Sequence, residues 1–212
     1  MKKQNRKKAI KTRPATAVGL KGKQQVKDIL ANARQLLTEE GYEEFSVRAV
    51  ADRCGLAQAG LQYYFPTRVN LIHALVQDVY NRYEEKHHKR FDKLPDEPRQ
   101  RFISYVDFLL NDIHNRKTRR FFIQLWALLH STGIPVKILK ELYKHQLAFI
   151  SALLMDLKPE LTNATANDRA AMIAAMLEGM IISLPVTQSS KPGSRNNFDH
   201  NIREMLLKIA IT

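Results

Sequence analysis

Apolar residues recur every three or four positions along most of the 212-residue chain, and the strict alternation typical of a half-buried strand is not found. Glycine, proline or polar clusters interrupt this pattern at intervals. The pattern predicts an all-α fold with about nine helices and no internal repeats. The expected helices cover roughly 23–41, 46–54, 57–63, 66–91, 98–115, 117–131, 135–157, 168–184 and 198–211.

Two consecutive helices in this series are short and are joined by a turn of a few residues. Ser46 can cap the first of them with its hydroxyl group, and Gly55 can adopt the left-handed conformation that ends it. Leu61 and Tyr64 of the second helix are expected to face inward. Two helices in this arrangement form a helix-turn-helix. The alternative is an αα-corner in an ordinary helical core, because motifs of this kind also occur by chance.

Composition and charge narrow the class of protein. Hydrophobic residues make up 44% of the chain and charged residues 26%, which is typical of a globular protein. The single cysteine, Cys54, excludes an intrachain disulfide and a cysteine-based zinc site, and it fits the reducing cytoplasm. The formal net charge of +13 indicates a polyanionic partner, most often nucleic acid. Enhanced solubility or a membrane-surface patch are the alternatives.

Neither a signal peptide nor a membrane span is expected. The basic start lacks a following apolar segment, and no apolar run approaches the length of a transmembrane helix.

Basic residues are concentrated at the start of the chain, before the first acid, Asp28. Residues 1–22 contain few apolar side chains, so they are expected to form a disordered basic arm. Such an arm next to a helix-turn-helix can follow DNA phosphates or enter the minor groove. A solvated tail with no specific role is the alternative. The basic residues are Lys2, Lys3, Arg6, Lys7, Lys8, Lys11, Arg13, Lys21, Lys23 and Lys27.

The segment around the two short helices resembles a known family. The shared features are Gly41-Tyr42, Phe45-Ser46-Val47-Arg48-Ala49-Val50-Ala51, Cys54-Gly55-Leu56, Leu61-Gln62-Tyr63-Tyr64-Phe65-Pro66-Thr67-Arg68 and Leu71. They resemble the N-terminal domain of the tetracycline-repressor (TetR) family of transcriptional regulators, over roughly Val26 to Leu75. The resemblance implies an all-helical dimer whose larger C-terminal domain binds a small molecule and thereby releases operator DNA.

Three residues depart from the pattern of that family. Ala57 replaces a common Ser or Thr at the start of the recognition helix, Gly60 replaces a Thr or Ser, and Gln62 replaces a Tyr. Glycine inside a helix costs about 0.5–1 kcal/mol relative to alanine. The recognition helix is therefore expected to be only marginally ordered without DNA, and the operator sequence cannot be carried over from the family.

The types of side chain in and around the two short helices indicate which residues can contact DNA. Arginine donates bidentately to guanine or phosphate, and glutamine pairs with adenine in the major groove. Tyrosine hydroxyls can donate to phosphate, and the start of a long helix favours an anion. A buried Tyr64 with an internally satisfied hydroxyl is the alternative for that residue. The candidates are Arg48, Gln58, Ala59, Gln62, Tyr63, Tyr64 and Arg68.

The last two helices, 168–184 and 198–211, are expected to form a homodimer interface. They carry more apolar surface than one partner can cover, and pairing with a second copy would give an isologous four-helix interface. Packing inside one subunit is the alternative. The expected interface stripes are Met172, Ile173, Met176, Leu177, Met180 and Ile181 on the first helix and Ile202, Met205, Leu206, Ile209 and Ala210 on the second.

A ligand site is expected where aromatic and methionine side chains of several helices converge. Ordinary core packing is the alternative for the same residues. Glu178 is unusual as an acid within an apolar helix; it can bind a cationic ligand, pair with an arginine or face water at a dimer rim. The candidates are Phe108, Trp126, Leu129, His130, Phe149, Met176 and Met180.

These observations predict a sequence-specific transcriptional regulator, a repressor released by an unknown small-molecule effector. The expected parts are a basic arm at 1–22, a helix-turn-helix domain at 23–70, and an effector-binding and dimerisation domain at 71–212. No cofactor or metal is expected, since the adjacent His87 and His88 point about 100° apart on a helix. An architectural DNA binder without a ligand is one alternative, and an all-helical enzyme is the other.

Overall fold

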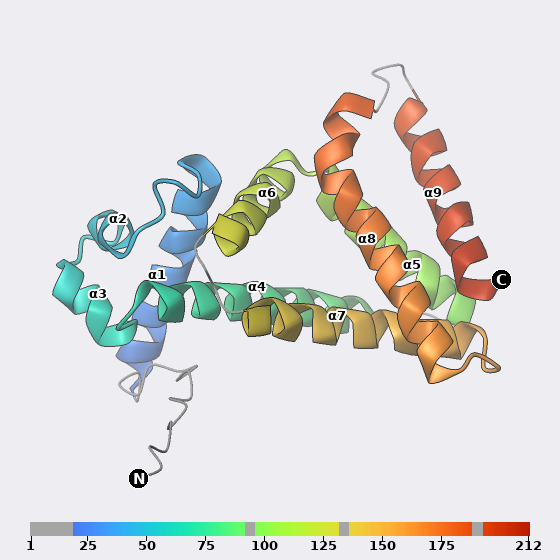
Figure 1. Cartoon of the computed structure of the whole chain (residues 1–212), viewed down its shortest axis with the longest axis horizontal. Coiled ribbons are helices and arrows are strands. Elements are labelled where there is room, and N and C mark those ends of the chain that lie inside the picture. Colours follow the sequence, from blue (N-terminus) through green and yellow to red (C-terminus); the bar gives the residue numbers. More distant parts are fainter. Residues whose placement is uncertain (1–18, 92–95, 132–135, 188–192) are drawn as a thin grey trace, which may run out of the picture. The chain divides into compact units, whose positions relative to one another are not determined.

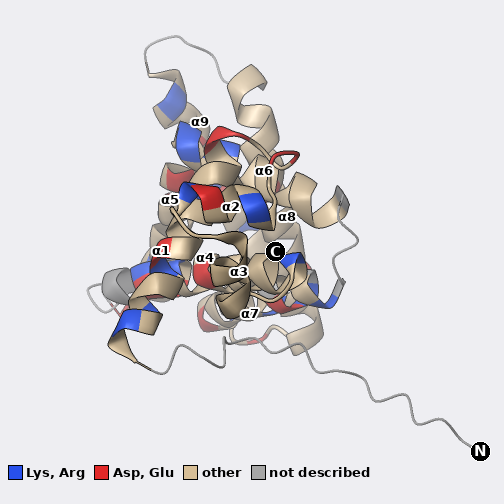
Figure 2. Ribbon diagram, turned by 90° about the vertical axis from the view of Figure 1, so that its left-hand side faces the viewer, with Lys and Arg blue, Asp and Glu red and all other residues tan. Residues whose placement is uncertain are grey.

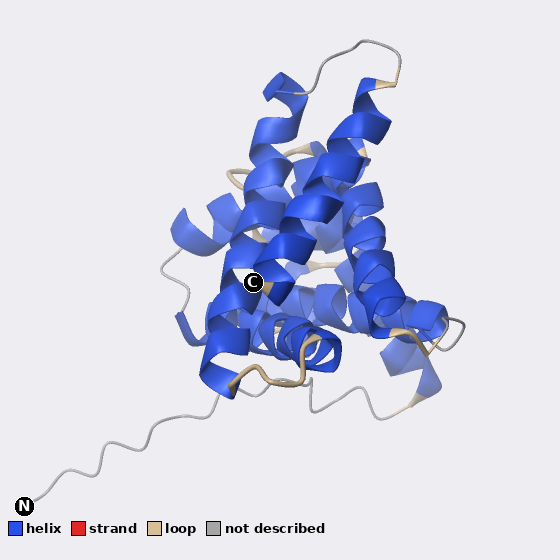
Figure 3. Cartoon of the chain, turned by 90° about the vertical axis from the view of Figure 1, so that its right-hand side faces the viewer, coloured by secondary structure: helices blue, strands red, loops and turns tan. Residues whose placement is uncertain are grey.

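The computed structural model describes residues 19–91, 96–131, 136–187 and 193–212. These residues form helices without any strand, so the all-α prediction is confirmed (Figures 1 and 3). The described helices are α1 (Leu20–Glu39), α2 (Val47–Arg53), α3 (Gln58–Tyr64), α4 (Arg68–Phe91), α5 (Pro98–His114), α6 (Arg116–Ser131), α7 (Val136–Leu157), α8 (Asn163–Thr187) and α9 (Ser194–Ile211).

The chain divides into two compact units, Met1–Tyr80 and Asn81–Thr212. The division falls inside α4, ten residues after the boundary at 70/71 expected from the sequence. Leu71, Ile72 and Leu75 of α4 are fully buried, so this part of the helix contributes to the core of the first unit. The sequence-based boundary was placed where the motif ends, whereas the compact unit includes the first turns of the next helix.

Several helix limits differ from those expected, and local capping explains two of them. α1 begins at Leu20, inside the arm expected at 1–22, whose first eighteen residues lie outside the described part of the chain. α4 begins at Arg68 rather than Pro66, because the Thr67 hydroxyl accepts a hydrogen bond from the Asn70 amide at 3.1 Å. α8 begins five residues early, because the Thr162 hydroxyl accepts from the Thr165 amide at 3.2 Å.

Pro185 was expected to end α8, and this was wrong, since the helix continues to Thr187. Proline lacks one amide donor and disturbs the preceding turn. In the last turn of a helix this costs little, because few further hydrogen bonds depend on it. α9 likewise begins at Ser194 rather than Phe198, directly after Gly193 with a φ of 78°.

Unit 1 buries one face of each of its first three helices. The core includes Ile29 and Leu37 of α1, Val50 of α2 and Leu61 of α3. Arg53, the last residue of α2, donates to the carboxylates of Glu39 and Glu40 at the end of α1. These ion pairs fix α2 against α1, and Arg34 makes a similar contact with Asp78 of α4 at 2.9 Å.

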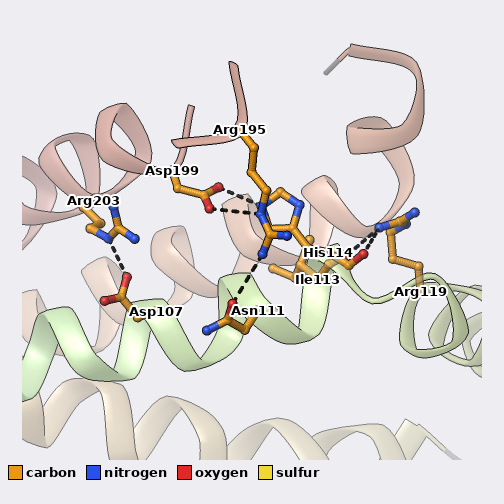
Figure 4. Close-up of polar contacts among 8 residues, drawn as sticks. All are labelled: Asp107, Asn111, Ile113, His114, Arg119, Arg195, Asp199 and Arg203. Atoms are coloured by element: carbon orange, nitrogen blue, oxygen red, sulfur yellow. Dashed lines mark hydrogen bonds and ion pairs between the residues drawn. The ribbon is translucent and has the colours of Figure 1, made fainter. Parts of the chain in front are cut away.

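Unit 2 has a core built by α5, α7, α8 and α9, with Tyr105 at 1% exposure among its largest buried side chains. A row of polar contacts ties α5 to α9 beside this core (Figure 4). Arg203 pairs with Asp107, and His114 Nε2 lies 2.7 Å from Asp199 Oδ1. Arg119 of α6 donates to the carbonyl oxygens of Ile113 and His114, which end α5.

The residues Asn163–Val186 of α8 are long and apolar enough to cross a membrane by length and composition alone. The expectation that no run approaches that length was therefore wrong. A core helix of a globular domain meets the same criterion. In α8, Ala170, Ile173 and Leu184 are buried against the rest of unit 2, and 39% of the apolar window is buried, so core packing accounts for only part of this composition.

Candidate functional site

The helix-turn-helix has the capping geometry expected from the sequence. The Ala49 amide donates to the Ser46 hydroxyl at 3.0 Å, which caps α2. Gly55 has a φ of 65°, and the Leu56 amide donates back to the Ala51 carbonyl at 2.9 Å. Any residue with a Cβ atom would be strained at this φ, so the turn between α2 and α3 depends on Gly55.

α3 buries one side and exposes the other. Leu61 has no exposed surface, whereas Gln58, Ala59 and Gln62 are exposed and Tyr63 is 60% exposed. The helix carries no charged residue, in contrast to α2, which carries both signs (Figure 2). The exposed side therefore carries the amides of Gln58 and Gln62, the phenol of Tyr63 and the methyl group of Ala59. Side chains of these kinds can contact base edges in the major groove.

Tyr64 lies between the two sides of α3. It is half-buried, and its ring packs edge-to-face on Tyr63 with ring centroids 5.2 Å apart. Ala57, which precedes α3, makes no side-chain cap, as its residue type requires. The helix is thus held by Leu61 and its neighbours rather than by capping.

Two arginines flank α3 in the sequence. Arg48 is 81% exposed, and its only described ion pair is with Asp52 at 3.8 Å, an exposed contact worth little. Arg68 opens α4 and is half-buried. Its Nε is buried and has no hydrogen-bond partner among the described residues.

A second cluster of interest lies within unit 2, where five aromatic rings form a chain. Tyr83 packs edge-to-face on Phe108 and Phe122, with ring centroids 6.0 and 5.9 Å apart. Phe122 contacts Trp126 at 5.9 Å, and Trp126 is stacked on Tyr143 at 5.9 Å with an interplanar angle of 17°. We refer to these five rings as the aromatic chain.

Each of the two tyrosines of the aromatic chain donates to a carboxylate. The Tyr143 hydroxyl donates to Glu178 Oε2 at 2.6 Å, and the Tyr83 hydroxyl donates to Asp112 Oδ2. Burial raises the pKa of Glu178, although the hydrogen bond from Tyr143 opposes this effect. Burial, together with the adjacent carboxylate, raises the pKa of both tyrosines, so each phenol remains a proton donor.

The predicted ligand residues are divided between several surroundings. Phe108 and Trp126 belong to the aromatic chain. Phe149 packs on Tyr105, with ring centroids 5.1 Å apart, in the core that also contains Met176 and Met180. Leu129 is buried, whereas His130 is exposed and bonds through Nδ1 to the Trp126 carbonyl. The structure therefore places two of the seven in the aromatic chain and three others in the core of unit 2.

Sequence reasoning missed Tyr83, Phe122, Tyr143 and Asp112 as members of this cluster. Each was assigned to a helix, but most of the contacts join different helices, such as Tyr83 with Asp112, 29 positions apart, and Tyr143 with Glu178, 35 positions apart. Single-helix periodicity contains no information about such pairs. The one usable signal was Glu178 itself, an acid in an apolar helix.

The apolar residues of α8 are distributed differently from the expected interface stripe. Ile173, Leu177, Met180 and Ile181 are buried inside unit 2, so they cannot form a free dimer face in the described fold. Leu206 and Ala210 of α9 are also fully buried, whereas Met205 is 50% exposed. A separate stripe of α8 faces outward, and its exposed residues are Ala171, Met172, Ala175, Gly179, Ile182 and Val186.

Metal-binding residues do not gather in the part of the chain that the structure describes. No group of three or more His, Cys, Asp or Glu side chains there could hold an ion. The side chains of His87 and His88 lie outside the described set.

Comparison with known proteins adds a family match and structural neighbours. Residues 29–75 match the family model of bacterial regulatory proteins, tetR family, which includes α2 and α3. No curated protein matches the sequence.

Several solved structures that resemble the chain are described as transcriptional regulators. A protein from Pseudomonas aeruginosa PAO1, described as a transcriptional regulator, is 15% identical with a TM-score of 0.70, over 92% of this chain and 93% of that one. A TetR-family regulator from Agrobacterium tumefaciens is 20% identical with a TM-score of 0.65, over 86% and 97%. A regulator from Saccharomonospora viridis, solved with choline, is 16% identical with a TM-score of 0.66, over 88% and 95%.

Proposed function

We propose that this chain, a member of the tetR family of bacterial regulatory proteins, is a homodimeric repressor that a small-molecule effector releases from operator DNA. The exposed side of α3 is the observation that carries this proposal. It presents Gln58, Gln62 and Tyr63 on a helix held in unit 1 by the buried Leu61, and Arg48 of α2 is exposed as well. These groups can read base edges and bind phosphates, and the net charge of +13 favours a polyanion.

Homodimerisation is proposed through the outward stripe of α8. Its small residues Ala171, Ala175 and Gly179 allow close approach of a second helix, and Met172 and Ile182, at 56% and 65% exposure, would otherwise stay in water. α9 lies beside α8 (Figure 1) and adds the exposed Met205. An isologous interface of this kind matches a two-fold symmetric operator with two half-sites.

An effector site is proposed in unit 2. The aromatic chain contains Trp126 and Tyr143, which are half-buried rather than sealed in the core. The structural neighbour from Saccharomonospora viridis was solved with choline, and this supports a small organic effector for the present chain. α4 is continuous from Arg68 to Phe91 and includes Tyr83. A ligand that shifts Tyr83 would therefore act on the same helix that begins beside the proposed phosphate contact.

Selection from a pool of random DNA duplexes by the purified full chain tests the proposal. We expect a two-fold symmetric site whose half-sites lie about 34–36 Å apart or a multiple of this. Fluorescence anisotropy should then give binding at least about 10³-fold tighter than to a duplex with both half-sites scrambled. Equal affinity for both duplexes would favour the architectural alternative, in which the chain binds DNA without reading it.

The coupling to an effector is tested with the same selected duplex. If an effector releases DNA, then the duplex must weaken effector binding by the same factor, because the two affinities are linked. A protein of this function works in the cytoplasm, where operator DNA is found, and acts by binding; we propose no catalysed reaction for it.

A further inference from the structure

We infer that the aromatic chain, together with Glu178, forms a binding site for organic cations. This inference rests on the proposed function, since it names the chemical class of the effector. The site has three parts: the half-buried rings of Trp126 and Tyr143, the carboxylate of Glu178, and the inner rings that continue to Tyr83.

Among the acids of the described part of unit 2 that are not exposed, Asp107, Asp112, Glu178 and Asp199, the pairing separates Glu178 and Asp112 from the other two. Asp107 pairs with Arg203, and Asp199 pairs with His114 and Arg195. Among the residues that the structure describes, Glu178 and Asp112 instead accept only from tyrosine hydroxyls. This is notable in a chain with 34 basic and 21 acidic residues, where a basic partner would be easy to supply.

A half-buried carboxylate without a cation is costly, because burial removes water that stabilises the charge. Burial raises the pKa of Glu178 for this reason. A hydrogen bond from Tyr143 compensates only part of the cost. A ligand with a positive charge would complete the pairing, so the free energy of binding includes the neutralisation of Glu178.

The rings next to Glu178 favour the same class of ligand. Aromatic faces attract cations, and tryptophan does so most strongly. Trp126 and Tyr143 are nearly parallel, and both residues keep part of their surface exposed. An ammonium group bound there would meet ring faces and a carboxylate together. A neutral ligand of the same shape would gain the apolar contacts and leave the Glu178 charge unpaired.

The experiment uses Trp126, which is the single tryptophan of the chain, as a fluorescent reporter. Phenyltrimethylammonium is titrated against the full chain, and tert-butylbenzene, its uncharged carbon analogue, serves as the matched ligand. We expect the cation to change the Trp126 emission and to bind at least tenfold more tightly than the analogue. Equal affinities, or no change with the cation, would overturn the inference.

The variant Glu178→Gln keeps the size of the side chain and an acceptor for Tyr143 but removes the charge. We expect it to bind the cation at least tenfold more weakly and to bind tert-butylbenzene unchanged. Asp168→Asn, at an exposed acid of the same helix, should bind both ligands like the unmodified chain. Unchanged cation affinity in Glu178→Gln would overturn the inference; if that variant does not fold, the two-ligand comparison on the unmodified chain still decides it.

The DNA-selection experiment and the cation-binding experiment can fail independently of each other. A chain that selects a duplex but does not prefer the cation retains the proposed function and loses this inference. A chain that prefers the cation but selects no duplex retains the cation site and loses the proposed function.

Discussion

His114 Nε2 lies 2.7 Å from Asp199 Oδ1, and both side chains are at most 10% exposed. The pair joins the end of α5 to the first turns of α9 (Figure 4). Arg195 extends it from the solvent side, at 3.7 Å from Asp199 Oδ2. A buried acid with two donors stabilises this corner of unit 2 as long as both donors keep their partner.

Asp199→Asn should therefore destabilise the fold, because an asparagine amide is uncharged and has a single oxygen to accept from both His114 and Arg195. A buried hydrogen bond to a charged group contributes about 1.5–3 kcal/mol. For a chain of this size the melting temperature falls by about 2–4 °C for each kcal/mol. Differential scanning calorimetry measures this. Arg195→Ala is the control, since its contact is half-exposed and should cost less than about 1 kcal/mol; an equal loss in both variants would contradict the assignment.

Gly60→Ala should stabilise α3. A Cβ atom added at Gly60 would meet nothing within 4 Å, and the residue lies in the interior of the helix. Replacing glycine by alanine there should add about 0.5–1 kcal/mol to helix stability. Amide hydrogen exchange of α3 should slow accordingly. Gly55→Ala is the contrasting variant and should destabilise, because Gly55 has a φ of 65°; a faster exchange in Gly60→Ala would contradict the prediction.

The local parts of this site could be predicted from the sequence, because their causes are local. Ser46 caps α2 and Gly55 ends it through contacts within a few residues. The aromatic chain could not be predicted in the same way, since Trp126 and Tyr143 meet only when α6 and α7 pack. The contact between these two rings depends on the tertiary packing of two helices, which the sequence of either helix alone does not specify.

The outward stripe of α8 shows a different limit of sequence reasoning. The helix is apolar nearly all round, so periodicity alone does not tell which side is buried. The stripe expected as interface contained Ile173 and Leu177, which are in the core, and omitted Gly179 and Ile182, which are exposed. Only the packing of the neighbouring helices separates the two sides.

Arg48→Ala and Arg68→Ala should both weaken DNA binding, but with different dependence on sequence and salt. Arg48 is 81% exposed, and its contact with Asp52 is a weak exposed one. If Arg48 reads a base edge, its loss should cost about 1–3 kcal/mol on the selected duplex and reduce discrimination at one position. Arg68 opens α4, and its loss should weaken binding to all duplexes and reduce the salt slope by about one unit. Anisotropy titrations at several salt concentrations measure both effects.

The same titrations on a scrambled duplex provide the control. If Arg48→Ala weakens binding to both duplexes equally, then Arg48 contacts the DNA backbone instead. If Arg68→Ala leaves the salt slope unchanged, then its buried Nε reflects a structural role for the whole side chain.

Ala175→Glu should convert the proposed dimer to monomers. Ala175 lies in the middle of the outward stripe of α8, and two-fold symmetry would bring two buried carboxylates close together. Sedimentation velocity should show at least a tenfold weaker association, with an unchanged helical circular dichroism spectrum. Ala152→Glu, at an exposed position of α7, is the matched control and should remain dimeric. A dimeric Ala175→Glu would place the interface elsewhere.

Glu178→Gln should raise the stability of the ligand-free chain at neutral pH. Burial raises the pKa of Glu178 in the folded state, so the fold binds this proton more tightly than the unfolded chain does. The charged carboxylate therefore costs stability once the pH exceeds the unfolded pKa of glutamate, about 4.3, and the full cost is present above the raised folded pKa. Glutamine does not titrate, and it keeps an acceptor for the Tyr143 hydroxyl.

Melting temperatures of Glu178→Gln and the unmodified chain, measured from about pH 4 to pH 8, should diverge as the pH rises, with the variant higher at pH 8. Asp168→Asn, at an exposed acid of α8, should show no such divergence. A variant less stable than the unmodified chain at neutral pH would mean that the charge of Glu178 is stabilised by the fold, and the site would then not require a cationic ligand to complete it.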